Sequence, residues 1–137
     1  MDQAHQTLVE EEKVQDNKPT ILIVEDDPVL LKMYSEKLGF DGFGVLTAKD
    51  GEEALQISQT ETINMILLDI MLPRMSGTDF LEKFRTTAKG KTVPVIALTN
   101  LAEDAERQRA LDLGVKEYLV KAMQTPEQVV QTIKKYL

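Results

Sequence analysis

Short apolar runs recur along the chain, and several of them end abruptly at a polar residue. The run ILIV at residues 21–24 stops at Glu25, and the run MILL at residues 65–68 stops at Asp69. Continuous apolar runs of this length are typical of strands that are buried on both faces, as in a parallel sheet. We predict five strands, at residues 21–24, 44–48, 63–68, 93–98 and 117–120.

Between these runs, apolar residues follow helical spacing behind residues that commonly cap helices. The predicted caps are Asp27, Asp50, Ser76, Asn100 and Thr125. A proline follows both Asp27 and Thr125, at the first helical position, where its missing amide hydrogen is not needed. The predicted helices end near residue 39, beyond residue 57, and near residues 88, 114 and 136.

The alternation of five strands with five helices predicts the fold class. Connections that contain a helix allow successive strands to pair in parallel, and their right-handed crossovers put helices on both faces of the sheet. We therefore expect an α/β protein with a doubly wound, five-stranded parallel sheet, formed by residues 20–137.

The first 19 residues lack this pattern. They hold five acidic residues, two lysines and a few scattered apolar residues, which is too little to build a core. We predict that residues 1–19 form a polar, acidic, disordered tail.

Composition narrows the chemistry that this domain could perform. The 137 residues carry 16 Lys and Arg against 23 Asp and Glu, a net charge of −7, which argues against direct nucleic-acid binding and against binding to anionic membranes. No apolar run is long enough to span a membrane, and we expect a cytoplasmic protein. Because there is no cysteine and only one histidine, His5, thiolate sites and multi-histidine sites are excluded.

Polar residues follow four of the five predicted strands. Glu25 and Asp26 follow the first strand, Asp69 the third, Thr99 the fourth and Lys121 the fifth. The carboxyl ends of parallel strands lie along one edge of a sheet, so we expect these side chains to converge there. Clustered carboxylates suit a hard cation such as Mg²⁺, and a carboxylate can also act as the nucleophile that forms an aspartyl phosphate.

Four segments resemble the receiver domain of bacterial two-component response regulators. They are ILIVEDDP at 21–28, MILLDIMLPRMSG at 65–77, VIALT at 95–99 and GVKEYLVK at 114–121. The resemblance covers about residues 20–137. It implies the flavodoxin-like (βα)5 fold with strand order 2-1-3-4-5.

The resemblance also implies a magnesium site. Asp69 would be the phosphoacceptor, and Asp26 a direct ligand of Mg²⁺. Glu25 would act partly through water, and the backbone carbonyl of Met71 would complete the protein ligands. Mn²⁺ could take the place of Mg²⁺.

Three further residues would respond to the phosphoryl group. The resemblance implies that Thr99 senses it, that Lys121 pairs with it, and that the Tyr118 rotamer is coupled to activation. The donor would be a histidine kinase or a phosphotransfer protein. The effector would bind through the fourth helix, fifth strand and fifth helix, and a homodimer is possible. The chain would then be a signalling protein that assists its own phosphorylation and dephosphorylation, and not an enzyme for other substrates.

Two residues depart from the family pattern and keep alternatives open. Ala122 stands where the family usually has a cis proline, and Asn100 stands where it usually has a very small residue. They give weight to a phosphorylation-independent interaction module of the same fold. An aspartyl-nucleophile phosphatase of the haloacid dehalogenase type is a weaker alternative, since it needs a second Asp at the position of Met71.

Several of these residues also have ordinary structural interpretations. Glu25, Asp26 and Asp27 could be a helix cap with solvated neighbours, and Thr99 could be a cap of the following helix. The charged run at residues 103–109 is most simply a solvated helix face with pairs three or four positions apart, although partner binding there stays open.

Overall fold

The computed structural model describes residues 18–100 and 103–137, so most of the predicted tail at 1–19 lies outside the described residues. Within them, five parallel strands form one sheet in the order β2-β1-β3-β4-β5. The strands are β1 (Thr20–Val24), β2 (Gly44–Ala48), β3 (Met65–Leu68), β4 (Val95–Thr99) and β5 (Glu117–Val120). The predicted α/β class, the parallel pairing and the flavodoxin-like strand order are confirmed.

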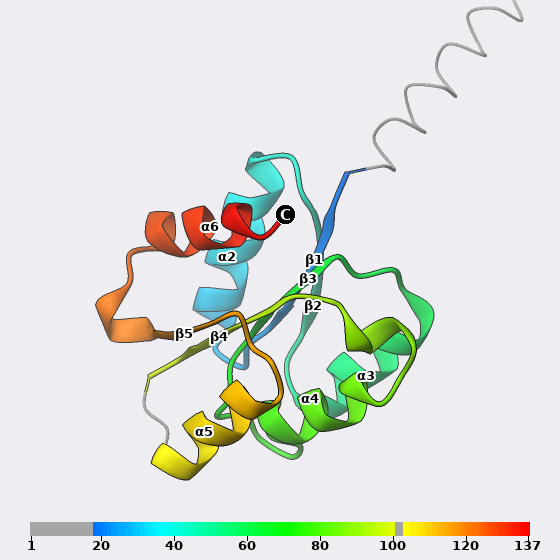
Figure 1. The fold of residues 1–137 in the computed structure, drawn as a ribbon. Helices are drawn as coiled ribbons and strands as arrows, with labels where there is room; N and C mark the ends of the chain where they lie inside the picture. Colours follow the sequence, from blue (N-terminus) through cyan, green and yellow to red (C-terminus); the bar gives the residue numbers. More distant parts are fainter. Residues whose placement is uncertain (1–17, 101–102) are drawn as a thin grey trace, which may run out of the picture.

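Helices cover both faces of this sheet (Figure 1). They are α2 (Pro28–Phe40), α3 (Gly51–Thr60), α4 (Gly77–Arg85), α5 (Asp104–Asp112) and α6 (Pro126–Lys135). Two short 3-10 helices, η1 (Lys89–Lys91) and η2 (Lys121–Met123), lie in the connections. Figure 1 places α2 and α6 on one face and α3, α4 and α5 on the other.

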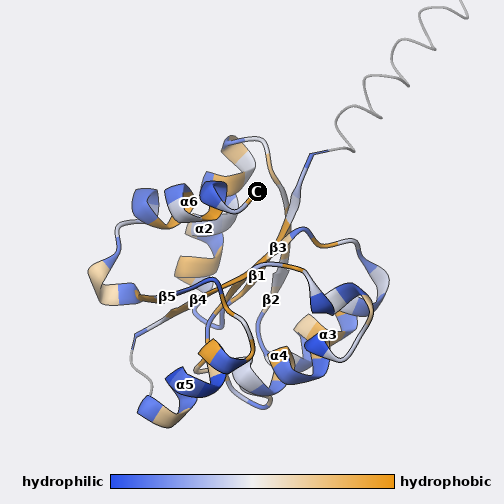
Figure 2. Cartoon of the chain, viewed as in Figure 1, coloured by the Kyte–Doolittle hydropathy of each residue, from blue (hydrophilic) through white to orange (hydrophobic). Residues whose placement is uncertain are grey.

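The core has two halves, one on each face of the sheet. Alternate residues of β1 point to opposite faces. Ile21 and Ile23 pack with the α2 and α6 side chains, whereas Leu22 and Val24 pack with those of α3 and α4. In Figure 2 the hydrophobic colours follow the strands and the inner sides of the helices. This two-sided burial explains why β1, β3 and β4 are continuous apolar runs in the sequence.

Four predicted caps hold, because the side chains of Asp27, Asp50, Ser76 and Thr125 each accept a backbone N–H at the start of a helix. Asn100 is wrong as a cap. The helix after β4 begins at Asp104, behind Glu103, and Asn100 is not part of its first turn.

Helix α4 ends at Arg85 and not near residue 88. The hydroxyls of Thr86 and Thr87 donate to the carbonyls of Lys83 and Phe84, at 2.6 and 2.7 Å, and so satisfy carbonyls that another helical turn would have used. Strands β3 and β4 each start two residues later than predicted. Among the described residues, no helix is both long enough and apolar enough to cross a membrane.

Candidate functional site

The polar residues at the strand ends meet at the carboxyl edge of the sheet, as predicted. They line a cleft of about 350 Å³ together with neighbours from the adjoining loops. The lining residues are Glu25, Asp26, Asp27, Leu30, Asp69, Met71, Thr99, Asn100 and Lys121. Residues that are far apart in the sequence reach this cleft because β1, β3, β4 and β5 are neighbours in the sheet.

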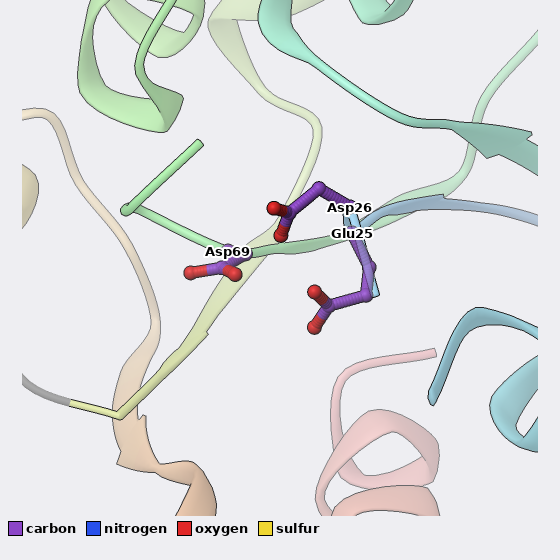
Figure 3. Close-up of side chains that lie close together, drawn as sticks. All are labelled: Glu25, Asp26 and Asp69. Carbon is purple, nitrogen blue, oxygen red and sulfur yellow. The ribbon is translucent and has the colours of Figure 1, made fainter. Parts of the chain in front are cut away.

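Three carboxylates dominate one side of the cleft (Figure 3). One oxygen of each of Glu25, Asp26 and Asp69 lies within 4.8 Å of the others. Glu25 and Asp69 are buried, and Asp26 is exposed. Three anions this close repel one another unless a cation lies between them. Two oxygen donors from buried side chains and one from an exposed side chain fit a hard divalent cation that keeps part of its water shell.

Asp69 is held in a fixed orientation by contacts to both carboxylate oxygens. Lys121 Nζ lies 2.8 Å from Oδ2, and the backbone N–H of Met71 donates to Oδ1 at 3.0 Å. The Asp69 backbone N–H donates to the Val24 carbonyl of the neighbouring strand at 3.0 Å. The carboxylate is therefore positioned from its backbone outward, as a nucleophile needs to be.

Glu25 is held as tightly as Asp69. Its Oε1 lies 2.6 Å from Lys121 Nζ, and its Oε2 accepts the Asp27 N–H at 3.1 Å. Burial raises the pKa of Glu25, and the nearby Asp69 charge adds to this, while Lys121 and the Asp27 amide act against it. The raised pKa indicates that the anion at Glu25 is not fully compensated by Lys121.

Lys121 bridges Glu25 and Asp69 with a nearly buried ammonium group. Burial alone would lower the pKa of Lys121. The hydrogen bonds that Lys121 donates to Asp69 and Glu25, together with their two negative charges, outweigh burial, so the pKa is raised and the side chain stays charged. The sequence predicted a partner for a phosphoryl group at this position, but it did not predict that Lys121 would contact two carboxylates.

The three acidic residues after β1, Glu25, Asp26 and Asp27, make different contacts. Glu25 points inward to Lys121, Asp26 completes the carboxylate cluster, and Asp27 caps α2 by accepting the Val29 N–H at 2.9 Å. The interpretation of the triplet as a helix cap is thus right for Asp27 only.

Two hydroxyls are buried and have no hydrogen-bond partner among the described residues. They belong to Thr99, at the end of β4, and to Tyr118, in β5. Burial raises the pKa of the Tyr118 phenol, and the Arg107 guanidinium lies 5.6 Å from its ring centroid. A buried hydroxyl without a partner costs free energy, so both side chains gain from any rearrangement that supplies one.

Ala122 lies in η2, directly after Lys121, and the described residues contain no cis peptide bond. Asn100 is exposed at the mouth of the cleft. The sequence did not predict that Arg109 contacts α4. Its partners there are 27 to 31 residues away, and no local spacing of residues reveals them.

A sequence model of the response regulator receiver domain family matches residues 21–134. The probable transcriptional regulator ycf27 of Cyanophora paradoxa is 38% identical over 111 residues, which are 81% of this chain and 45% of the relative. The probable transcriptional regulatory protein TcrX of Mycobacterium tuberculosis is 38% identical over 119 residues, 85% of this chain and 49% of the relative. The chain thus spans about half the length of these curated relatives.

Solved structures agree with this similarity. The chemotaxis response regulator CheY4 of Vibrio cholerae superposes with a TM-score of 0.81 at 30% identity, covering 88% of this chain and 100% of that one. The receiver domain of the sensor histidine kinase PA1611 from Pseudomonas aeruginosa has a TM-score of 0.74 at 28% identity, covering 87% and 97%. That structure holds a magnesium ion in its active-site cleft.

Proposed function

The chain belongs to the response regulator receiver domain family of two-component signalling, and from that premise we propose that Asp69 accepts a phosphoryl group from a phosphohistidine. The observation that carries the proposal is the position of Asp69. It is a buried carboxylate at the end of a central strand, oriented through both oxygens and within 4.8 Å of two further carboxylates. The phosphohistidine belongs to a histidine kinase or a phosphotransfer protein.

The transfer exchanges one bond at phosphorus. A carboxylate oxygen of Asp69 attacks the phosphorus, the phosphorus–nitrogen bond breaks, and the leaving imidazole takes a proton from solvent. Lys121 holds the Asp69 carboxylate before the attack and pairs with a phosphoryl oxygen after it. The Thr99 hydroxyl, which is buried without a partner among the described residues, donates to another phosphoryl oxygen.

The donor set fits a magnesium ion, because it offers hard oxygen atoms and a surplus of negative charge. Glu25, Asp26, Asp69 and the Met71 carbonyl would hold it. When bound, Mg²⁺ or Mn²⁺ neutralises charge that develops on the transferred group. Lys121 supplies only one positive charge against the three carboxylates, so we expect phosphorylation to require the divalent ion.

The proposed output is a change of surface and not turnover of an external substrate. We assign the effector surface to α5, β5 and α6, where Tyr118 and Thr99 can transmit the change. We propose action in the cytoplasm on a protein partner, with a homodimer as one possible form. The named relatives are transcriptional regulators, but this chain covers only about half of their length, and its net charge of −7 disfavours direct DNA binding.

The test is the intact mass of the full chain after incubation with Mg²⁺ and acetyl phosphate. We expect a gain of one phosphoryl group that chelation of the metal prevents. Asp69→Ala removes the nucleophile and should show no gain, whereas Asp104→Asn, an exposed acid outside the cleft, should gain the group as the natural chain does.

Two outcomes would contradict the proposal. A folded natural chain that binds Mg²⁺ yet gains no mass, from acetyl phosphate or from a phosphorylated histidine protein, would point to the phosphorylation-independent module. Steady turnover of phosphate monoesters would instead point to a phosphatase.

A further inference from the structure

A cluster of polar side chains joins α4 to α5, and we call it the clasp. From α4 it takes Thr78, Asp79 and Glu82, and from α5 it takes Glu106 and Arg109. The Arg109 Nη2 group donates to Asp79 Oδ1 at 2.8 Å and to Glu82 Oε2 at 3.1 Å. Its Nη1 group donates to Thr78 Oγ1 at 3.2 Å and lies 3.8 Å from Glu106 Oε1.

Thr78 is the centre of the clasp. It is fully buried, and its single hydroxyl proton goes to Glu106 Oε2 at 2.6 Å. Its oxygen can therefore only accept from Arg109 and from the Ser76 hydroxyl, which lies 3.2 Å away. Both helices thus meet at one buried oxygen whose bonding capacity is fully used, which makes the geometry specific.

The α4 side of the clasp is fixed to the phosphoacceptor segment. The Gly77 N–H donates to the Ile70 carbonyl at 3.0 Å. A Cβ atom at Gly77 would lie about 2.2 Å from the Asp69 carbonyl oxygen, so the two backbones touch without room for a side chain. Thr78 is the next residue, and therefore its hydroxyl is placed by the same backbone that places Asp69.

The α5 side has few other attachments. Ala110 is the one buried residue of α5, and Glu103 makes no side-chain cap at its start. Arg107 stacks on Tyr118, and Gln108 bonds within the helix to Asp112. With so little apolar burial, the position of α5 depends on polar contacts with α4, namely the clasp and the bond that Arg85 donates to the Leu113 carbonyl at 3.0 Å at the other end of the helix.

We propose that Thr78 and Arg109 are positioning residues that hold α5 against displacement and so set how readily a phosphoryl group on Asp69 shifts this helix. This inference rests on the proposed function. Displacement of α5 from α4 breaks the clasp, so the clasp opposes the displaced arrangement. A ligand at Asp69 that favours displacement must overcome this opposition, and by linkage a weaker clasp raises the apparent affinity for that ligand.

The experiment measures the beryllium fluoride concentration that half-saturates the full chain in the presence of Mg²⁺, followed by amide NMR signals near Asp69. Thr78→Val keeps the buried volume and removes the hydroxyl, and Arg109→Leu removes the guanidinium group. Each should lower the half-saturating concentration by about three- to tenfold, which corresponds to the loss of one or two hydrogen bonds. Arg109→Lys keeps the positive charge but lacks the planar guanidinium group. Its half-saturating concentration should lie between those of the natural chain and of Arg109→Leu.

The control is Lys83→Gln, which removes a positive charge from an exposed position of α4 outside the clasp and should leave the half-saturation unchanged. Urea unfolding of every variant separates the effects. A merely structural role would lower the free energy of unfolding without tighter binding of beryllium fluoride.

Each remaining outcome has one meaning. If the natural chain binds and both clasp variants bind with unchanged or weaker affinity, the clasp does not oppose displacement and the inference is wrong, while the proposed function stands. If the natural chain does not bind beryllium fluoride at all, the proposed function fails and the inference falls with it.

Discussion

Helices α4 and α5 are neighbours on one face of the sheet and have the same length of nine residues, yet they are held in different ways. Helix α4 buries Gly77, Thr78, Phe80, Leu81 and Phe84, and α5 buries only Ala110. The difference is visible in Figure 2, where α5 is mostly hydrophilic in colour. Helix α4, which supports the Asp69 loop, is anchored in the core by several side chains, whereas α5 has only Ala110 there.

The two kinds of attachment differ in free energy. Full burial of a large apolar side chain stabilises by about 1.5–3 kcal/mol, and α4 buries three. Partly exposed ion pairs such as those of Arg109 contribute about 0.2–1 kcal/mol each. Displacement of α5 would therefore cost less free energy than displacement of α4.

The largest expected effect comes from the same substitution in the two helices. Leu81→Ala in α4 removes a fully buried side chain and should lower the free energy of unfolding by about 2–5 kcal/mol. Leu111→Ala in α5 removes a side chain that is 41% exposed and should cost about 1 kcal/mol. Urea unfolding measures both, and equal losses would show that α5 is anchored as firmly as α4.

Amide hydrogen exchange sharpens the comparison without a substitution. The backbone amides of α5 should exchange at least about tenfold faster than those of α4, because α5 can open locally without exposing a large apolar surface. Exchange followed by NMR at neutral pH resolves the two helices. Similar protection in both would mean that they open together as one cooperative unit.

The smallest expected effect is that of salt. Raising the concentration of sodium chloride from about 0.1 to 1 M screens the partly exposed charges of the clasp and should speed exchange in α5 by about two- to fivefold. Exchange in the centre of α4 should not speed up, since apolar burial holds it. The Arg109→Leu variant is the matched control. Because this variant lacks the guanidinium group, sodium chloride should have few ion pairs of the clasp left to screen. A salt effect of equal size in that variant would exclude the clasp as its cause.

Much of the site could be predicted because strand ends are a local property of the sequence. The runs before Glu25 and Asp69 are apolar enough to be strands, and parallel pairing brings their ends to one edge. The start of α5 was predicted wrongly at Asn100, since a residue type that favours the cap position does not by itself fix where a helix begins. The roles of Thr99, Lys121, Met71 and Tyr118 toward a phosphoryl group stay predictions.

The sequence by itself determined the order of strands and helices, the parallel sheet and the set of residues at its carboxyl edge, because burial on two faces and helix capping leave short-range patterns. Only the tertiary structure decided which charges pair. Lys121 reaches Asp69 across 52 residues, and Arg109 turns to α4 instead of pairing only along its own helix. Ion pairs between distant segments depend on the spacing of packed layers, and no local pattern of residues encodes that spacing.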